Sequence, residues 1–147
     1  MVKVLVKRLD PNVNLPSYKT EGSSGMDLMA NIEKSITIPP KKSAIIPTGL
    51  SIAIPNDCEV QIRPRSGLAA KSNISVLNTP GTIDSDYRGE LKIILFNHGD
   101  KDFIVNNNDR IAQMILMPIL KMELEEIENL PKNIRGSGGF GSTGKLI

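Results

Sequence analysis

The stretch SAIIPTGLSIAIPNDCEVQIR, residues 43–63, predicts the fold class of this chain. Runs rich in Ile, Val and Leu are interrupted in it by two turn clusters, Pro47-Thr48-Gly49 and Pro55-Asn56-Asp57. Short runs of this composition, bounded by Gly, Pro, Asn and Asp, are typical of antiparallel strands joined by tight turns. Proline cannot donate a ladder hydrogen bond, so Pro47 indicates a strand edge or a bulge.

The same pattern continues on both sides of this stretch. Strand-like runs are expected at residues 2–6, 35–38, 43–54, 59–63, 74–77, 91–96, 103–105 and 111–117. Many short strands without alternating helices predict an all-β, antiparallel sandwich or barrel. Residues 66–71 (SGLAAK) are the exception, because they read as the start of one short helix with Ser66 as its N-cap. Pro118, like Pro47, suggests an edge or a bulge.

Bulk composition excludes several classes of protein. The 147 residues correspond to about one domain. A net charge of +2 and few aromatic residues do not fit a nucleic-acid-binding surface. A single cysteine, Cys58, excludes an intramolecular disulfide framework. With one cysteine and one histidine, His98, in the chain, a structural zinc site is improbable.

No targeting or membrane segment is apparent in the sequence. Residues 1–9 alternate charged and apolar side chains, unlike a signal peptide. The longest apolar run, residues 111–120, is broken by Gln113 and Pro118 and is shorter than the ~18 residues that a membrane helix needs. A soluble, cytoplasmic protein is therefore expected.

The C-terminal residues form a separate compositional zone. Five of the twelve glycines lie in residues 135–147 (RGSGGFGSTGKLI), so we expect a domain at residues 1–134 and a flexible tail at 135–147. Glycine amides, hydroxyls and the Arg135 guanidinium could wrap phosphate oxygens. Residues 139–145 fit the GxxxxGK pattern, but Leu146 follows instead of Ser or Thr, so a Walker-type P-loop is rejected. A plain disordered tail is the alternative, and Phe140 argues against it because its ring could stack on a base.

Two internal segments could carry chemistry. Residues 63–67 (RPRSG) place two guanidiniums just before the expected helix, where they would favour an anion, although Ser66 could simply cap that helix. Residues 81–89 (GTIDSDYRG) read as a hairpin in which Asp84, following an apolar residue, could be a general base. Asp86 is more simply a solvated turn residue, and Tyr87 either a pocket wall or a cross-strand packing residue.

Five segments in order carry a resemblance to a known family. They are residues 25–28 (GMDL), 64–67 (PRSG), 81–89 (GTIDSDYRG), 109–113 (DRIAQ) and 135–144 (RGSGGFGSTG). Together they resemble the five motifs of the homotrimeric dUTPases, over nearly the whole chain. Two positions depart from the usual pattern. Asn108 stands where many members have glycine, and asparagine tolerates positive φ; Met29 stands where some relatives have Arg or an aromatic residue.

The resemblance implies a jelly-roll or β-barrel-like protomer and a homotrimer whose three active sites are each built from all three subunits. It implies hydrolysis of dUTP to dUMP and pyrophosphate by water that Asp84 activates for attack on the α-phosphate. That reaction limits uracil incorporation into DNA and supplies dUMP for dTMP synthesis. Mg²⁺ would be bound mainly through substrate phosphates and water, with Asp27 acting through water. No direct nucleic-acid or membrane partner is implied.

The resemblance also implies roles for individual residues. Asn78 and the backbone of the hairpin would bind uracil, Tyr87 would lie under the deoxyribose, and Phe140 of the tail would close over the base. The full set of implied substrate-binding residues is Arg65, Ser66, Gly67, Asn78, Gly81, Thr82, Ile83, Tyr87, Gln113, Arg135, Phe140, Gly141, Ser142 and Thr143.

Two other functions remain open from the sequence. A dCTP deaminase shares this fold by resemblance, but it needs an acid–base residue at the cytosine amino group, and the glycine-rich tail fits dUTPases better. A catalytically silent trimeric β-sandwich that binds nucleotides is the alternative outside enzymes. The presence of Asp84, Ser66 and Gln113 argues against loss of catalysis.

Overall fold

The computed structural model describes residues 1–139. The tail residues Phe140, Gly141, Ser142 and Thr143, for which substrate contacts are predicted, therefore lie outside the described residues. Within 1–139 no helix is long and apolar enough to cross a membrane.

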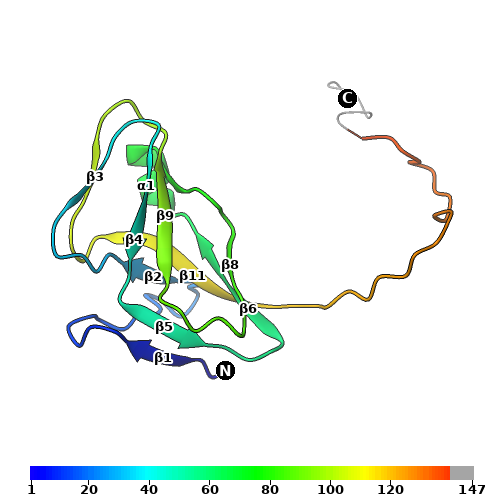
Figure 1. The fold of residues 1–147 in the computed structure, drawn as a ribbon, viewed down its shortest axis with the longest axis horizontal. Helices are drawn as coiled ribbons and strands as arrows, with labels where there is room; N and C mark the ends of the chain where they lie inside the picture. The colour runs from blue at the N-terminus through cyan, green and yellow to red at the C-terminus, as the bar shows by residue number, and fades with distance from the viewer. Residues whose placement is uncertain (140–147) are drawn as a thin grey trace.

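The regular secondary structure of the described chain consists of short strands and one helix (Figure 1). The elements are β1 (Leu5–Arg8), β2 (Met26–Met29), β3 (Ile36–Ile38), β4 (Ser43–Pro47), β5 (Leu50–Ala53), β6 (Cys58–Arg63), α1 (Ser66–Ser72), β7 (Ile74–Val76), β8 (Gly81–Ile83), β9 (Lys92–Asn97), β10 (Phe103–Val105) and β11 (Arg110–Pro118).

The strands pair antiparallel in four small sheets, and among residues 1–139 they do not close into a barrel. The largest sheet has the order β2-β11-β6-β8, and a second has the order β4-β9-β7. Two-stranded sheets join β1 to β5 and β3 to β10. This is the jelly-roll-type, all-β arrangement expected from the sequence, without barrel closure.

Alternating side chains explain where the core lies. In β6, Cys58, Val60 and Ile62 are buried, whereas the intervening side chains are half-buried. β9 alternates in the same way, with Ile93 and Leu95 almost fully buried. Because successive side chains of a strand point to opposite faces, these residues meet in one core between the sheets. The other face of the β2-β11-β6-β8 sheet carries Glu59, Gln61, Arg63 and Gln113 together with the apolar Ile115 and Met117.

Several sequence predictions can be compared directly with the structure. The run at residues 103–105 is a strand with the expected bounds, and the run at 43–54 is two strands separated by a turn at Gly49, whose φ is +68°. Asn108 has a φ of +66°, which confirms that it tolerates the conformation usually given to glycine. Pro47 ends an edge strand, and Pro118 ends β11 beyond its pairing with β2, where β6 is the only strand paired with it; both prolines lie at sheet edges, as expected.

Other predictions were incomplete or wrong. β2 and β8 were not predicted as strands, because each is only three or four residues long and lies inside a motif rich in Gly and Asp. Ser66 is not the N-cap of α1: it is the first helical residue, and Arg65 is the N-cap, without a side-chain capping hydrogen bond. The Ser66 hydroxyl is therefore not needed to cap the helix.

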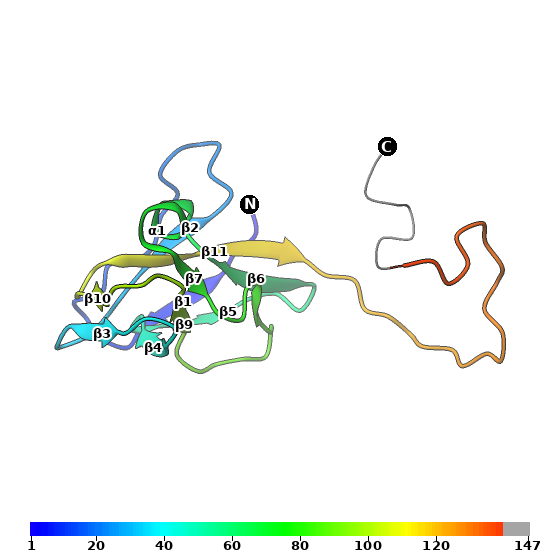
Figure 2. The same ribbon diagram turned by 90° about the horizontal axis from the view of Figure 1, so that it is seen from above.

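An extended arm follows β11 and leaves the body of the molecule (Figure 2). The backbone N–H of Ile119 donates to the carbonyl of Asp57 at 2.9 Å, and residues 120–137 beyond it are exposed. The extended arm thus begins near residue 119, and the division into a domain at 1–134 and a tail at 135–147 stays a prediction.

Candidate functional site

The first candidate group lies on the loops that flank β8. Asn78 precedes the strand and is exposed, whereas Gly81 at its start is buried. A side chain on Gly81 would lie 3.1 Å from Asn78 Nδ2 and 3.4 Å from Ile62 Cβ. The glycine therefore lets the Asn78 side chain fold back close to the β8 backbone. We call residues 78–87 the β8 hairpin.

Asp84 is the first residue after β8 and is exposed. Its carbonyl accepts a hydrogen bond from the Tyr87 N–H at 3.1 Å, which closes a tight turn over Ser85 and Asp86. Arg88 Nη1 holds the same turn by donating to the carbonyls of Ser85 at 2.7 Å and Tyr87 at 2.9 Å. The carboxylate of Asp84 is thus carried on a loop whose backbone is fixed at several points.

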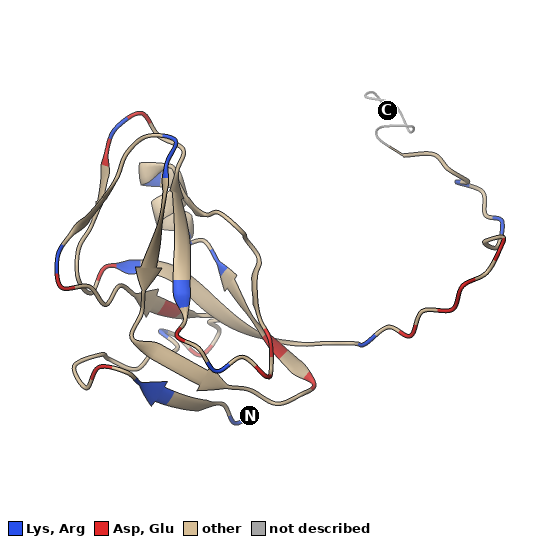
Figure 3. Cartoon of the chain, viewed as in Figure 1, with Lys and Arg blue, Asp and Glu red and all other residues tan. Residues whose placement is uncertain are grey.

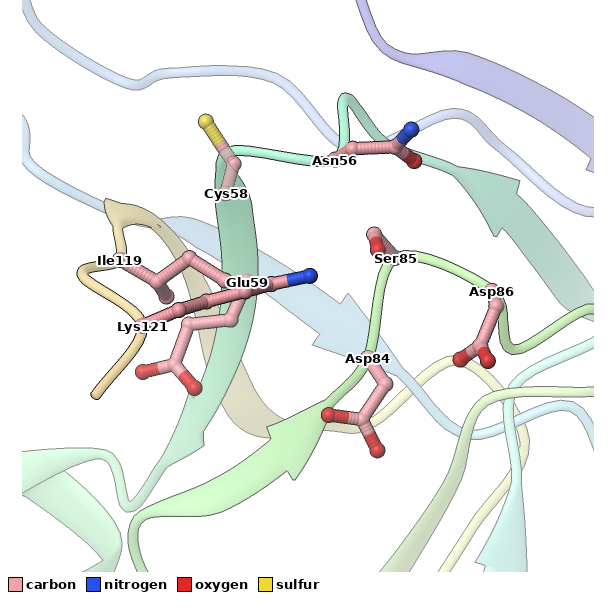
Figure 4. Close-up of a pocket in the computed structure, with 8 residues that line it drawn as sticks. All are labelled: Asn56, Cys58, Glu59, Asp84, Ser85, Asp86, Ile119 and Lys121. Atoms are coloured by element: carbon pink, nitrogen blue, oxygen red, sulfur yellow. The ribbon is translucent and has the colours of Figure 1, made fainter. Parts of the chain in front are cut away.

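A hollow of about 530 Å³ lies beside Asp84 at the end of the large sheet (Figure 4). Its lining residues are Asn56, Cys58, Glu59, Asp84, Ser85, Asp86, Ile119 and Lys121. Figure 4 shows the carboxylates of Asp84 and Glu59 pointing to the same side. Burial raises the pKa of the Cys58 thiol, and the negative charge of Asp57 raises it further, so the thiol is held in its neutral form.

The second candidate group surrounds Asp27 on β2, and we call it the arginine cluster. Arg65 Nε donates to Asp27 Oδ1 at 2.8 Å, and Arg110 Nη1 lies 3.4 Å from Asp27 Oδ2. Arg65 also donates to the carbonyl of Arg110 at 3.0 Å. Asp27 therefore fixes two guanidiniums side by side next to Ser66, with a net positive charge.

Gln113 lies in β11 between β2 and β6, opposite Asp27 and Arg63. Its Nε2 donates to the carbonyl of Pro64 at 2.9 Å, which ties β11 to the segment that leads into α1. A side chain on Gly25 would lie 2.8 Å from Gln113 Oε1, so glycine is needed there to make room for the amide. Arg65 and Gln113 thus lie on neighbouring strands and the segment that leads into α1, where Ser66 is the first helical residue; their role in phosphate binding stays a prediction.

The β8 hairpin and the arginine cluster are well separated within one chain. β6 lies between β11 and β8. On one side Gln113 is opposite Arg63, and on the other Ile83 is opposite Val60. Continued by one residue, this register places Asp84 beside Glu59. Four residues along β6 and two strand spacings across give a separation of about 16 Å between the backbones at Gln113 and Asp84. Arg135 is more remote, since it lies on the arm with its Nε donating to the Gly138 carbonyl at 2.8 Å.

The chemistry of each group follows from its side chains. The arginine cluster offers guanidinium, hydroxyl and amide donors to an anion. The β8 hairpin offers an exposed carboxylate, an amide side chain and an aromatic ring. Within residues 1–139 there is no group of three or more His, Cys, Asp and Glu side chains that could form a metal cage. Asp27 is the candidate metal contact, and both of its oxygens already face arginines.

Some residues that shape these groups were not predicted as site residues. Arg110 is next to the predicted Ile-Ala-Gln run, but its pairing with Asp27 joins residues 83 positions apart. Gly89 and Glu90 follow Tyr87, and the Tyr87 hydroxyl donates to the Glu90 carbonyl at 3.0 Å. The alternation of Glu59, Gln61 and Arg63 in β6 is visible in the sequence, but their mutual hydrogen bonds are not.

Comparison with known proteins adds independent evidence. The family model of the dUTPases matches residues 11–144 of this chain. A curated deoxyuridine 5'-triphosphate nucleotidohydrolase of Fusobacterium nucleatum is 51% identical over 146 residues, covering 99% of this chain and 100% of the relative. The protein of the same name from Clostridium tetani is 52% identical over 140 residues, covering 95% of each chain.

Solved structures show the same fold. A mutant dUTPase of Staphylococcus bacteriophage 80alpha with bound dUpNHpp superposes with a TM-score of 0.87 at 24% identity, covering 97% of this chain and 98% of that chain. A dUTPase from phage phi11 of S. aureus, described with a structural Mg(II) ion, gives a TM-score of 0.79 at 21% identity, covering 88% of this chain and 99% of that chain.

Proposed function

Since the chain belongs to the dUTPase family and is a dUTP diphosphatase that hydrolyses dUTP to dUMP and pyrophosphate, we propose that Asp84 is its general base. The observation that carries this proposal is the position of Asp84, which is exposed on a fixed turn directly after β8 and is bonded through its carbonyl to the Tyr87 N–H of the same hairpin. A carboxylate there can take a proton from water beside a bound nucleotide.

The proposed reaction needs one proton transfer and one displacement. Asp84 accepts a proton from a water molecule while the water oxygen forms a bond to the α-phosphorus. The bond from the α-phosphorus to the bridging oxygen breaks, and pyrophosphate leaves with that oxygen. General-base assistance contributes about 10²–10⁴ to the rate, so positioning and neutralisation of the phosphate charge must supply the rest.

Recognition of the nucleoside is assigned to the β8 hairpin. Asn78 and the backbone of Gly81, Thr82 and Ile83 would form hydrogen bonds to uracil, and a close fit would exclude the methyl group of thymine. The Tyr87 ring, which is 44% exposed, would pack under the deoxyribose and leave no space for a 2′-hydroxyl. The compact fold of Asn78 over Gly81 supports this assignment.

The triphosphate is assigned to the arginine cluster and to the tail. Arg65, Ser66, Gly67 and Gln113 would bind phosphate oxygens; in support, Arg65 and Gln113 are held at the segment that leads into Ser66 and Gly67. The tail residues Arg135, Phe140, Gly141, Ser142 and Thr143 would add the clamp implied by the family resemblance.

Mg²⁺ would be bound mainly by the phosphate oxygens of the substrate, and this donor set fits that arrangement. Mg²⁺ keeps several waters and prefers phosphate oxygens to an all-protein cage, and Asp27, paired with two arginines, could contact it through water. Bound there, the ion would offset the charge of the triphosphate.

We further propose that each active site combines residues of three copies of this chain. Within one chain the backbones at Gln113 and Asp84 are about 16 Å apart along the large sheet, so the arginine cluster and the proposed base do not lie side by side. The arm supports the same arrangement, since it carries Arg135 away from the body of its own subunit (Figure 2). A closed trimer would bring the β8 hairpin, the arginine cluster and the tail of different subunits together.

The sequence of the arm fits docking on another copy. Leu120, Met122 and Leu124 are 98%, 87% and 87% exposed and alternate with charged residues, as in a strand that has one apolar face. β1 pairs with β5 on one side only, and its residues are exposed. The arm carries a run of glutamates whereas β1 carries Lys7 and Arg8 (Figure 3), so the charges are complementary.

The direct test is pyrophosphate release from dUTP by wild type and by Asp84→Asn. The asparagine keeps the size of the side chain but removes the base, so turnover should fall by about 10²-fold or more while dUTP still binds. Asp86→Asn is the matched control, because Asp86 is an exposed turn residue two positions away and should leave turnover nearly unchanged. Near-normal turnover in Asp84→Asn would falsify the assignment of the base. Release of deaminated product from dCTP would instead support the deaminase alternative.

A further inference from the structure

Tyr87 is held by two residues that follow it, Gly89 and Glu90. The Tyr87 hydroxyl donates to the Glu90 carbonyl at 3.0 Å. A side chain on Gly89 would lie 2.5 Å from Tyr87 Cζ and 2.9 Å from Cε2, far inside van der Waals contact. The tyrosine ring therefore lies directly against the backbone of Gly89.

Glu90 connects this ring to the buried part of the molecule. Its Oε1 accepts a hydrogen bond from the Gly49 N–H at 2.9 Å, and its Oε2 lies 3.8 Å from Lys92 Nζ. The Glu90 side chain is only 22% exposed. The carboxylate thus reaches across to the turn between β4 and β5.

Three hydrogen bonds tie that turn to Leu91. The carbonyl of Leu91 accepts hydrogen bonds from both the N–H and the hydroxyl of Thr48, at 3.2 and 2.7 Å. The Leu91 N–H donates to the Leu50 carbonyl at 2.8 Å. Thr48 and Leu91 are each 1% exposed. The main-chain carbonyl of Glu90, which precedes Leu91, is consequently fixed relative to the core. The Tyr87 ring that it holds is exposed.

We propose that Gly89 and Glu90 are positioning residues that fix the Tyr87 ring before substrate binds, and that this sets the preference for deoxyribose over ribose. The inference rests on the proposed function, in which Tyr87 faces the sugar. A ring that excludes one hydroxyl by contact must not tilt away, because a small displacement would open the space that it blocks. Gly89 allows the close approach. The Glu90 carbonyl fixes the distal end of the ring, and the Glu90 carboxylate holds that carbonyl in place through its bond to the Gly49 N–H.

The first test compares kcat/KM for dUTP and UTP in a graded series. Gly89→Ala and Glu90→Ala should lower the dUTP-to-UTP ratio about tenfold or more, mainly because kcat/KM for UTP rises. Glu90→Gln should restore most of the ratio seen in wild type, because its amide oxygen can still accept from the Gly49 N–H. Gly22→Ala is the matched control, since a side chain there would meet no atom within 4 Å.

Tyr87→Ala separates the failure of this inference from that of the proposed function. If Tyr87→Ala keeps the ratio, Tyr87 does not face the sugar, and both the proposed role of Tyr87 and the positioning inference fail. If Tyr87→Ala loses the ratio while Gly89→Ala and Glu90→Ala keep it, the role of Tyr87 stands and the positioning inference is overturned.

A spectroscopic test reports on the ring without turnover. The chain has two tyrosines and no tryptophan, so Tyr18→Phe leaves Tyr87 as the single tyrosine fluorophore. In that background, without nucleotide, Gly89→Ala and Glu90→Ala should lower the fluorescence anisotropy of Tyr87 below that of Gly22→Ala. Equal anisotropy in all of them would mean that Tyr87 is not held by these residues and would overturn the inference. Should Gly89→Ala fail to fold, the Glu90 variants decide the same question.

Discussion

Leu124→Asp tests the docking of the arm on another subunit. Leu124 is 87% exposed within its own chain, so in an isolated subunit the substitution removes almost no packing. If the arm docks on a second copy, the leucine becomes buried, and burying such a side chain contributes about 1.5–3 kcal/mol. At about 1.4 kcal/mol per tenfold change, each docked arm should then bind about 10–100 times more weakly, and burial of the new carboxylate adds to the loss.

The assay is sedimentation over a range of protein concentrations. Leu124→Asp should shift the association of subunits to a concentration at least tenfold higher, while circular dichroism of the dilute protein remains that of wild type. Asn129→Ser is the matched control, because Asn129 is an uncharged, exposed residue of the arm at a position that alternates with Leu124 in an extended chain. Association of Leu124→Asp at the wild-type concentration would refute the reasoning, since the leucine would then be as exposed in the assembly as in the subunit.

Three further predictions concern selectivity, metal and pH. The enzyme should prefer dUTP over dCTP and dTTP by about 10⁴-fold in kcat/KM, because hydrogen-bonding groups fitted to uracil would be mispaired with cytosine and crowded by a methyl group; comparable values would remove Asn78 and Gly81 from base recognition. EDTA should suppress activity without lowering the melting temperature, and unfolding on chelation would show that the metal is structural. The raised pKa of Cys58 means that the folded state keeps the thiol proton to higher pH than the unfolded state, so this contribution to stability is complete below about pH 8.5 and declines as pH rises further. The free energy of unfolding, measured with urea, should therefore fall less between about pH 8 and about pH 10 in Cys58→Ala than in wild type. An equal fall in both proteins would exclude the thiol as a cause.

Much of the fold could be predicted from local patterns in the sequence. β6 alternates apolar and polar residues with period two, whereas β9 is a short, continuous apolar run. Their ends are marked by Pro, Asn and Gly, so both were identified within one or two residues. β8 was missed because Gly81, Thr82 and Ile83 have no alternation of their own, and the strand exists through pairing with β6. Pairing between distant segments is a tertiary effect that local propensity does not contain.

The candidate site shows the same division. Asp84 is a candidate base from its place after an apolar residue in a hairpin, together with the motif resemblance, and its role stays a prediction. The pairing of Asp27 with Arg65 and Arg110 could not be identified, because it joins three distant segments through sheet register. The N-cap at Arg65 instead of Ser66 reflects a one-residue shift of a helix boundary, the least certain part of any prediction from sequence.

The claim that each active site is shared between subunits is tested most directly by mixing two inactive variants. One is Asp84→Asn, and the other lacks residues 135–147; each alone should have little activity toward dUTP. If the β8 hairpin and the tail of one site come from different subunits, co-refolding equal amounts should regain activity in about a quarter of the sites, given random mixing in a closed trimer. Mixed trimers confirmed by mass that show no activity above the two parents would contradict the account, because the tail would then serve the β8 hairpin of its own subunit.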